Sequence, residues 1–216
     1  MFTTITVIGA GRAGSAIAAR LRERGIAVAP DGELRLLCVP DGAIAEVAAA
    51  IEPGPWMAHV SGGTPLAALC PHTRRFSVHP LQTLTQTRGP EQLDGAFAAV
   101  TADDVDGRAR ARWLAETLGL IPFALADDQR AAYHAGASIA SNFLVTLYRS
   151  AAQLFEEAGA PPEALVPLMR RTIENGFELT GPIARGDWET VERHRSAIEG
   201  SGLERVYDAL AEVTRP

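Results

Sequence analysis

The feature that most constrains this chain is a glycine-rich turn near its start, in the segment Ile-Thr-Val-Ile-Gly-Ala-Gly-Arg-Ala-Gly at residues 5–14. Residues 4–8 are typical of a short buried strand, and residues 15–24 of an alanine-rich helix. The segment therefore predicts a strand, a tight turn and a helix, in that order.

The three glycines of this turn have different expected uses. Gly9 allows the tight turn, Gly11 lets the backbone approach a pyrophosphate, and Gly14 lets the helix pack closely on the strand. The N–H groups at the start of the helix, including those of Arg12 and Ala13, favour an anion. Together these residues predict a dinucleotide-binding α/β fold.

The composition is that of an ordinary globular protein. The chain has 216 residues, a hydrophobic content of 47% and a net charge of −6, which argues against a nucleic-acid-binding surface. Since no apolar run is long enough to span a bilayer, we expect no membrane association and a cytoplasmic location. No histidine, cysteine or carboxylate pair has metal-site spacing.

All twenty basic residues are arginine. Mechanisms that need a Schiff-base lysine, a lysine general acid or a Walker lysine are therefore excluded.

Alternating strands and helices continue through the first 125 residues, which we assign to one α/β domain. After a strand that begins at Leu34 and ends in a Pro-Asp turn, Asp41 is expected to cap a helix that ends near Ile51. A later helix is expected at residues 107–118, capped by Asp106. Further strands are expected at residues 57–60, 75–78, 96–100 and 121–124.

The region where the second strand and its helix should lie is unusually short. Only residues 30–33 separate the apolar runs at 26–29 and 34–39, whereas a parallel crossover normally needs a dozen or more residues. Either residues 26–29 lie outside the sheet, or they form an edge hairpin closed by Asp31 and Gly32. We favour a truncated sheet that lacks the second strand and its helix.

Residues 126–216 are expected to form an all-helical domain. A helix that starts at Asp127 or Asp128 meets no glycine or proline between 137 and 157, and about thirty residues of helix span about 45 Å. Helices should follow at about 163–175, 187–199 and 201–213. Because so long a helix usually buries its extra surface against a partner, we expect a homodimer.

Two polar stretches follow predicted strands. In His-Val-Ser-Gly-Gly at residues 59–63, glycine turns at a strand end suggest a ligand crevice, although a plain turn is the alternative interpretation. In Ser-Val-His-Pro-Leu-Gln-Thr at residues 77–83, the side chains of His79 and Gln82 could orient a substrate; a turn with a hydrogen-bonded histidine is the alternative.

Two more polar stretches lie in the helical part. His134, Ser138 and Asn142 have i, i+4, i+8 spacing and form a polar stripe that needs partners or a ligand, or else hydrogen bonds across a dimer interface. In Thr-Gly-Pro-Ile-Ala-Arg-Gly-Asp at residues 180–187, Arg185 could hold an anion and Asp187 could cap a helix; loop and cap chemistry alone is the alternative.

These stretches, behind the GAGRAG turn and the VPD turn, resemble one small family over nearly the whole chain. It joins a Rossmann-like domain to a helical domain of uncharacterised function, and its members are usually described as NADP-dependent oxidoreductases. The helical half resembles that of 6-phosphogluconate dehydrogenase-like enzymes, which are related to pyrroline-5-carboxylate and ketopantoate reductases.

The resemblance implies an NADP or NAD cofactor in the crevice and a substrate where the long helix meets the sheet. It implies catalytic roles for His134, Ser138 and Asn142, and substrate binding by His79, Gln82 and Arg185, the last from the same subunit or its partner. The expected cofactor-binding residues are Gly9, Gly11, Arg12, Ala13, Gly14, Val39, Pro40, Asp41 and Ser61.

Two departures from the family qualify this assignment. Related hydroxyacid dehydrogenases have a lysine on the long helix, whereas this chain offers His134, with Tyr133 as a poorer second acid. The apparent deletion removes the adenosine-ribose subsite, although Asp31 lies at roughly the distance from the glycines that is expected for the acid of NAD-type enzymes. We therefore expect a reductase of a small carbonyl or imine; a degenerate relative that binds another anionic small molecule is the alternative.

Overall fold

A computed structural model describes residues 1–215, which form two compact units divided between Ser141 and Asn142. The predicted division after residue 125 lies sixteen residues before this boundary. The helix α4, Arg130–Ser138, belongs to the first unit, because the Arg130 side chain at its start is buried against the sheet.

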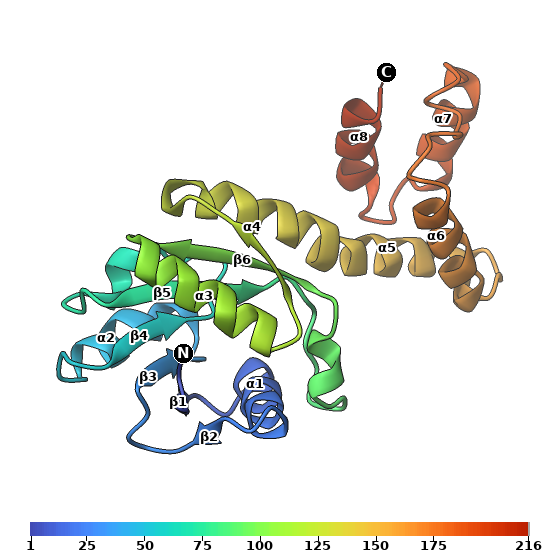
Figure 1. Cartoon of the computed structure of the whole chain (residues 1–216). Helices are drawn as coiled ribbons and strands as arrows, with labels where there is room; N and C mark the ends of the chain where they lie inside the picture. Colours follow the sequence, from blue (N-terminus) through green and yellow to red (C-terminus); the bar gives the residue numbers. More distant parts are fainter. Residues whose placement is uncertain (216) are drawn as a thin grey trace. The chain divides into compact units, whose positions relative to one another are not determined.

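The first unit is built on a seven-stranded sheet with the order β2-β1-β3-β4-β5-β6-β7 (Figure 1). The strands β1, β2, β3, β4 and β5 are parallel, β6 is antiparallel to β5, and β7 is parallel to β6. Their bounds are β1 Thr4–Ile8, β2 Ala27–Val28, β3 Leu34–Leu37, β4 Trp56–His59, β5 Arg75–Pro80, β6 Phe97–Ala102 and β7 Ile121–Ala124. The fold is Rossmann-like, and the strands expected from residue 57 onward are confirmed.

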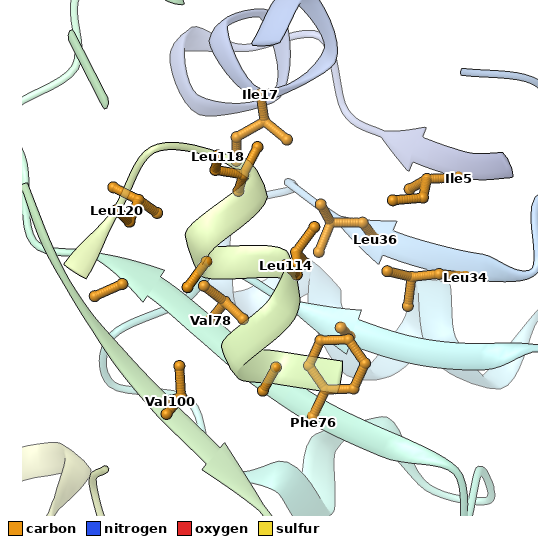
Figure 2. Close-up of a cluster of buried hydrophobic side chains, with 14 of the residues drawn as sticks. Ile5, Ile17, Leu34, Leu36, Phe76, Val78, Val100, Leu114, Leu118 and Leu120 are labelled. Atoms are coloured by element: carbon orange, nitrogen blue, oxygen red, sulfur yellow. The ribbon is translucent and has the colours of Figure 1, made fainter. Parts of the chain in front are cut away.

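Apolar side chains cover both faces of this sheet. On one face, α1 (Arg12–Glu23) and α3 (Val105–Thr117) pack on alternate strand residues, among them Leu36, Phe76 and Val78 (Figure 2). On the other, α2 (Ile44–Ala49) packs on residues such as Leu37 and Met57. Because strand side chains alternate between faces, residues next to Phe76 and Val78 must point toward the second face.

The region of the second strand is a correction to our prediction. A strand is present, but β2 is only two residues long and pairs parallel with β1; it is neither absent nor part of a hairpin. The crossover is possible because β2 ends level with Ile5, where β3 begins, so the chain need not return along a strand. Gly32 makes the passage possible, since a Cβ there would lie 2.4 Å from the Thr6 nitrogen. The predicted loss of the helix is confirmed.

Two predicted caps are wrong. The side chain of Asp104, rather than Asp106, caps α3 by accepting from the Gly107 N–H at 2.7 Å. Asp41 begins a short 3-10 helix ahead of α2 and makes no side-chain cap hydrogen bond; its carboxylate instead accepts from Ser61.

The second unit is all-helical, as predicted. It contains α5 Leu144–Glu157, α6 Leu165–Glu174, α7 Trp188–Ala197 and α8 Glu204–Val213. Asp187 caps α7 by accepting from the Thr190 N–H at 3.1 Å, which confirms its expected role. A π-helical segment, Ile139–Phe143, joins α4 to α5, so the long helix is not regular throughout. Among residues 1–215, none of the helices is long and apolar enough to cross a membrane.

Candidate functional site

The glycine turn between β1 and α1 has the geometry that its sequence predicts. Gly9 has a φ of +111°, and a Cβ there would lie 2.4 Å from the Cys38 carbonyl oxygen. At Gly14 a Cβ would lie 1.9 Å from the Gly9 carbonyl oxygen, so the close approach of α1 to the turn requires glycine.

Gly11 is different, because packing within the protein does not require it. Within the described chain, a Cβ at Gly11 would meet nothing within 4 Å. No side chain of residues 1–215 caps α1, and its first turn contains no acidic residue. The N-terminal end of α1 is thus open and electrically suited to a phosphate. The diphosphate part of a dinucleotide fits these residues.

The expected inner-ribose residues also meet at the carboxyl ends of the strands. Asp41 follows β3 and Ser61 follows β4, and the Ser61 hydroxyl donates to the Asp41 carboxylate at 2.8 Å. Ser61 is buried, whereas Asp41 is exposed. This arrangement holds Ser61 in place and leaves the Asp41 carboxylate accessible to a ligand.

Arg130 is a buried arginine at the start of α4 that joins this helix to β5, β6 and the turn after β4. Its guanidinium donates to Thr101 Oγ1 at 2.9 Å, to Ser77 Oγ at 2.8 Å and to the Ser61 carbonyl oxygen. Only 1% of the residue is exposed, and Nε lies 3.9 Å from the Asp127 carboxylate. Burial lowers the pKa of Arg130 from its usual value, and Asp127 opposes this shift. Arg130 therefore places a fixed positive charge beneath the turn at residues 61–63.

His59 lies next to this charge at the end of β4. The Ser61 N–H donates to its Nδ1 at 3.2 Å, so the proton of the neutral ring is on Nε2. That Nε2 is buried and has no hydrogen-bond partner among residues 1–215. Burial, reinforced by Arg130 and His79, lowers the pKa of His59 to about 3. A buried, unpaired N–H is costly, and a ligand oxygen would satisfy it.

Two further aromatic donors face His79 from α4. The Tyr133 hydroxyl lies 2.7 Å from His79 Nδ1, in a hydrogen bond, and the His134 ring lies perpendicular to His79 with centroids 6.1 Å apart. Burial lowers the pKa of His79 to about 4, with His134 and Arg130 adding to the shift. Burial raises the pKa of Tyr133, and Arg130 opposes this.

Gly62 makes room for these rings. A Cβ at Gly62 would lie 2.8 Å from His79 Cε1 and 2.9 Å from His134 Cδ2. At Gly63 a Cβ would lie 3.1 Å from His134 Nδ1. The two glycines therefore leave room for the rings of His79 and His134 beside this turn.

The remaining expected site residues are not drawn into this cluster by any contact in the structure. Both ends of the Gln82 amide are used within its own loop, at the Thr83 N–H and the Gln92 carbonyl. The guanidinium of Arg185 donates to the carbonyl of Thr180, five residues earlier. Ser138 ends α4, whereas Asn142 lies in the π-helical segment and belongs to the second unit. Their substrate and catalytic roles stay predictions.

The part of the fold that would hold the adenosine of a dinucleotide is the crossover between β2 and β3. Residues 29–33 replace the usual strand end and helix, and Asp31 among them is exposed. Thr6 Oγ1 organises this passage by donating to the Ala29 carbonyl at 2.7 Å and accepting from the Gly32 N–H at 2.9 Å. Arg35 of β3 also donates to Thr6 Oγ1 and to the Pro30 carbonyl, so the crossover is held by its own contacts and has one guanidinium beside it.

Residues 96–214, more than half of the chain, match the family described as Domain of unknown function (DUF2520). The chain belongs to this family. The match begins just before β6, so it includes α4 and the helical unit but not the glycine turn of this DUF2520 protein. No curated protein matches it.

Solved structures resemble the DUF2520 chain over almost its whole length. A Bacteroides fragilis protein described as an NADP oxidoreductase, BF3122, has a TM-score of 0.82 at 22% identity, covering 98% of this chain and 97% of its own. A reductive aminase from Aspergillus terreus, in complex with NADPH and ethyl-5-oxohexanoate, has a TM-score of 0.62 at 15% identity, covering 100% and 96%. The 1-pyrroline-5-carboxylate reductase of Streptococcus pyogenes has a TM-score of 0.61 at 15% identity, covering 98% and 96%. At these identities the likeness establishes the fold alone.

Sequence reasoning missed Arg130, although a signal was present. Arg130 precedes His134 by four residues and therefore continues the i, i+4, i+8 stripe by one more step toward the start of the helix. An arginine near a helix start usually lies in solvent, so the sequence alone gives no reason to extend the stripe to Arg130. Thr101 carried no comparable signal, since it lies within an apolar strand.

Proposed function

We propose that this DUF2520 protein is an NAD(P)-dependent oxidoreductase that reduces a small carbonyl or imine compound. The observation that carries the proposal is the grouping of His79, Tyr133 and His134 around Gly62, at the same sheet edge as the open turn at Gly11. Descriptions of the structural neighbours as an NADP oxidoreductase, a reductive aminase and a reductase support this reaction class.

A bound nicotinamide cofactor would supply the hydride. Gly11, Arg12 and Ala13 would hold its phosphates at the start of α1, and Asp41 and Ser61 would line the path toward β4. Two buried N–H groups near these residues, Nε2 of His59 and Nε of Arg130, have no hydrogen-bond partner among residues 1–215 and could donate to a ligand.

In this proposal His134 donates the proton to the substrate. Its side chain is exposed, unlike those of His59 and His79, so a substrate can reach it. Its contacts with Gly62 and Gly63 place the ring over the end of β4. The pair of Tyr133 and His79 is the second candidate donor, since its 2.7 Å hydrogen bond could relay a proton. Ser138 and Asn142 are proposed to orient the substrate, with Arg185 holding an anionic group.

The alternative function is that of a degenerate relative that binds another anionic small molecule. The two-residue β2 favours it, because the adenosine ribose lacks its usual support. The loss of two or three charged hydrogen bonds to the ribose or its phosphate, at about 1.5–3 kcal/mol each, would weaken cofactor binding by several powers of ten.

A thermal-shift titration separates the two functions. A reductase should show a melting temperature that rises with NADPH or NADH concentration, as binding linkage requires. A flat response at millimolar cofactor would remove the oxidoreductase proposal. Among variants, His134→Ala should abolish turnover and Tyr133→Phe should retain most of it; the opposite result would make Tyr133 the proton donor.

We also propose that the second unit forms a homodimer. Few of its apolar side chains are buried, and many large ones are exposed. The exposed set includes Phe143, Val145, Val166, Leu168, Ile173, Phe177, Leu179, Trp188, Leu210 and Val213. A second copy of this chain would cover such a surface. Light scattering coupled to size exclusion should give twice the 22.9 kDa chain mass, and a monomer at micromolar concentration would overturn the proposal.

A further inference from the structure

A groove of about 310 Å³ lies in the first unit between α1 and the loop that precedes β6. Its lining comprises Arg12, Ser15, Ala16 and Ala19 of α1 and Thr85, Gln86, Arg88, Gly89 and Pro90 of the loop. We call it the Arg12–Arg88 groove. It begins one residue after Gly11, beside the open end of α1.

The loop wall of this groove is shaped by a buried amide. Gln92 is 3% exposed, and its Nε2 lies 3.1, 2.8 and 2.9 Å from the carbonyl oxygens of Thr85, Arg88 and Gly89. Its Oε1 accepts from the Thr85 N–H at 2.8 Å. One side chain therefore fixes the path of residues 85–89, and the wall is formed without any ligand.

A buried arginine fastens this loop to α1. Arg20 is 7% exposed; its guanidinium donates to the Pro90 carbonyl at 2.8 Å and pairs with the Asp94 carboxylate at 2.9 Å. Because Arg20 lies on α1 and its partners on the loop, the two walls have a fixed separation. The backbone walls of such a groove need no rearrangement when a ligand binds, which lowers the cost of binding.

The charge in the groove is positive, in contrast to the net charge of −6 for the chain. No acidic residue is among its lining residues. Arg12 is exposed and makes no ion pair within the described residues, and Arg88 has one acidic neighbour, Glu91, at 3.9 Å. The start of α1 adds its partial positive charge.

We propose that the Arg12–Arg88 groove is a binding site for a phosphorylated small molecule, in which Arg12 and Arg88 hold a phosphate or diphosphate group. Guanidinium groups suit phosphate oxygens, and two arginines can hold one group between them. The site deepens the proposed function, on which it rests, by giving a dinucleotide an anchor that residues 29–33 lack. A separate phosphorylated ligand has the same chemistry.

Calorimetric titration with inorganic pyrophosphate at low salt tests the groove. The wild-type protein should bind pyrophosphate, and Arg12→Gln and Arg88→Gln should each weaken binding by about tenfold. The matched control is Arg112→Gln, since Arg112 is an exposed arginine on α3 that pairs with Glu116 away from the groove, and it should bind like wild type. Absence of binding at millimolar pyrophosphate, or equal affinities in all four proteins, overturns the proposal.

Competition with NADPH identifies the source of the phosphate. If NADPH displaces pyrophosphate and Arg88→Gln weakens NADPH binding, the groove holds the cofactor. If pyrophosphate binding persists at saturating NADPH, the groove takes a separate ligand. If the protein binds pyrophosphate through both arginines but does not respond to NADPH or NADH, the result supports the groove as a phosphate site and contradicts the oxidoreductase proposal. If the protein binds NADPH but not pyrophosphate, the result supports the oxidoreductase proposal and contradicts the groove as a phosphate site.

Discussion

Replacement of Arg130 by methionine tests the central packing contact of the site. Methionine fills similar space but donates no hydrogen bond, so the variant leaves Thr101 Oγ1, Ser77 Oγ and the Ser61 carbonyl without their buried donor. Three charge-assisted bonds would be lost, whereas the cost of burying the guanidinium would be removed. We expect a net loss of about 2–4 kcal/mol in the free energy of unfolding.

The assay is thermal unfolding followed by circular dichroism, with urea titration as a second measure. A loss of this size should lower the melting temperature by about 5–10 °C for a chain of this length. Arg130→Lys is the control, because one ammonium keeps the charge but cannot reach three acceptors; it should lie between wild type and Arg130→Met. A melting temperature for Arg130→Met within about 1 °C of wild type would refute the assigned role.

A second readout reports on charge rather than packing. Arg130 contributes to the lowered pKa of both His59 and His79, after burial itself. In Arg130→Met both values should therefore rise, as followed by NMR titration of the ring protons. Unchanged histidine pKa values would mean that the guanidinium charge does not reach the site.

Three other predictions concern the same sheet edge. The pKa values of His59 and His79 in the folded protein, about 3 and about 4, lie below the unfolded value of about 6.5, so protons bind the unfolded chain first as the pH falls. Stability should be complete above about pH 6.5 and fall toward pH 4, by at most about 2.7 kcal/mol per pH unit for two protons; urea titrations that agree at pH 7.5 and pH 5 would contradict this. Gly11→Ala should have the wild-type melting temperature, but NADPH should no longer raise it. Gly14→Ala should unfold at a much lower temperature, because only the Cβ at residue 14 would clash with backbone atoms. Gly62→Ala should keep the fold and separate the rings of His79 and His134, lowering turnover by at least tenfold; wild-type activity would show that their spacing does not matter.

The parts of the fold that follow local rules could be predicted from sequence. The glycine turn and the strands from β4 onward have short-range signals: apolar runs of strand length bounded by turn residues. The cap of α3 was misplaced by two residues because Asp104 and Asp106 are both acceptable caps, and only the hydrogen bond to Gly107 distinguishes them. Helix boundaries of this kind depend on geometry that spacing alone does not contain.

The structural features that the sequence did not predict depend on contacts between distant segments. The length of β2 is set by how far the chain can follow β1 before Gly32 must cross it, which is a property of the sheet. The partners of Arg130 lie 29, 53 and 69 residues earlier in the chain. The role of Gly62 likewise requires knowing that His79 and His134 meet there. The sequence singles out His79 and His134 as candidates, but it shows neither the contacts of Arg130 nor the close approach of the two rings at Gly62.

The separation of Arg130 from its partners also bears on the order in which the protein folds. Its bonds can form only after β4, β5 and β6 have assembled, and until then its charge is better solvated by water than by a partial sheet. Docking of α4 should therefore be a late event, absent from the folding transition state. In stopped-flow measurements Arg130→Met should then refold at the wild-type rate and unfold faster. An arginine that contacts β5, β6 and the turn after β4 at once can therefore be bound in full only by a completed sheet.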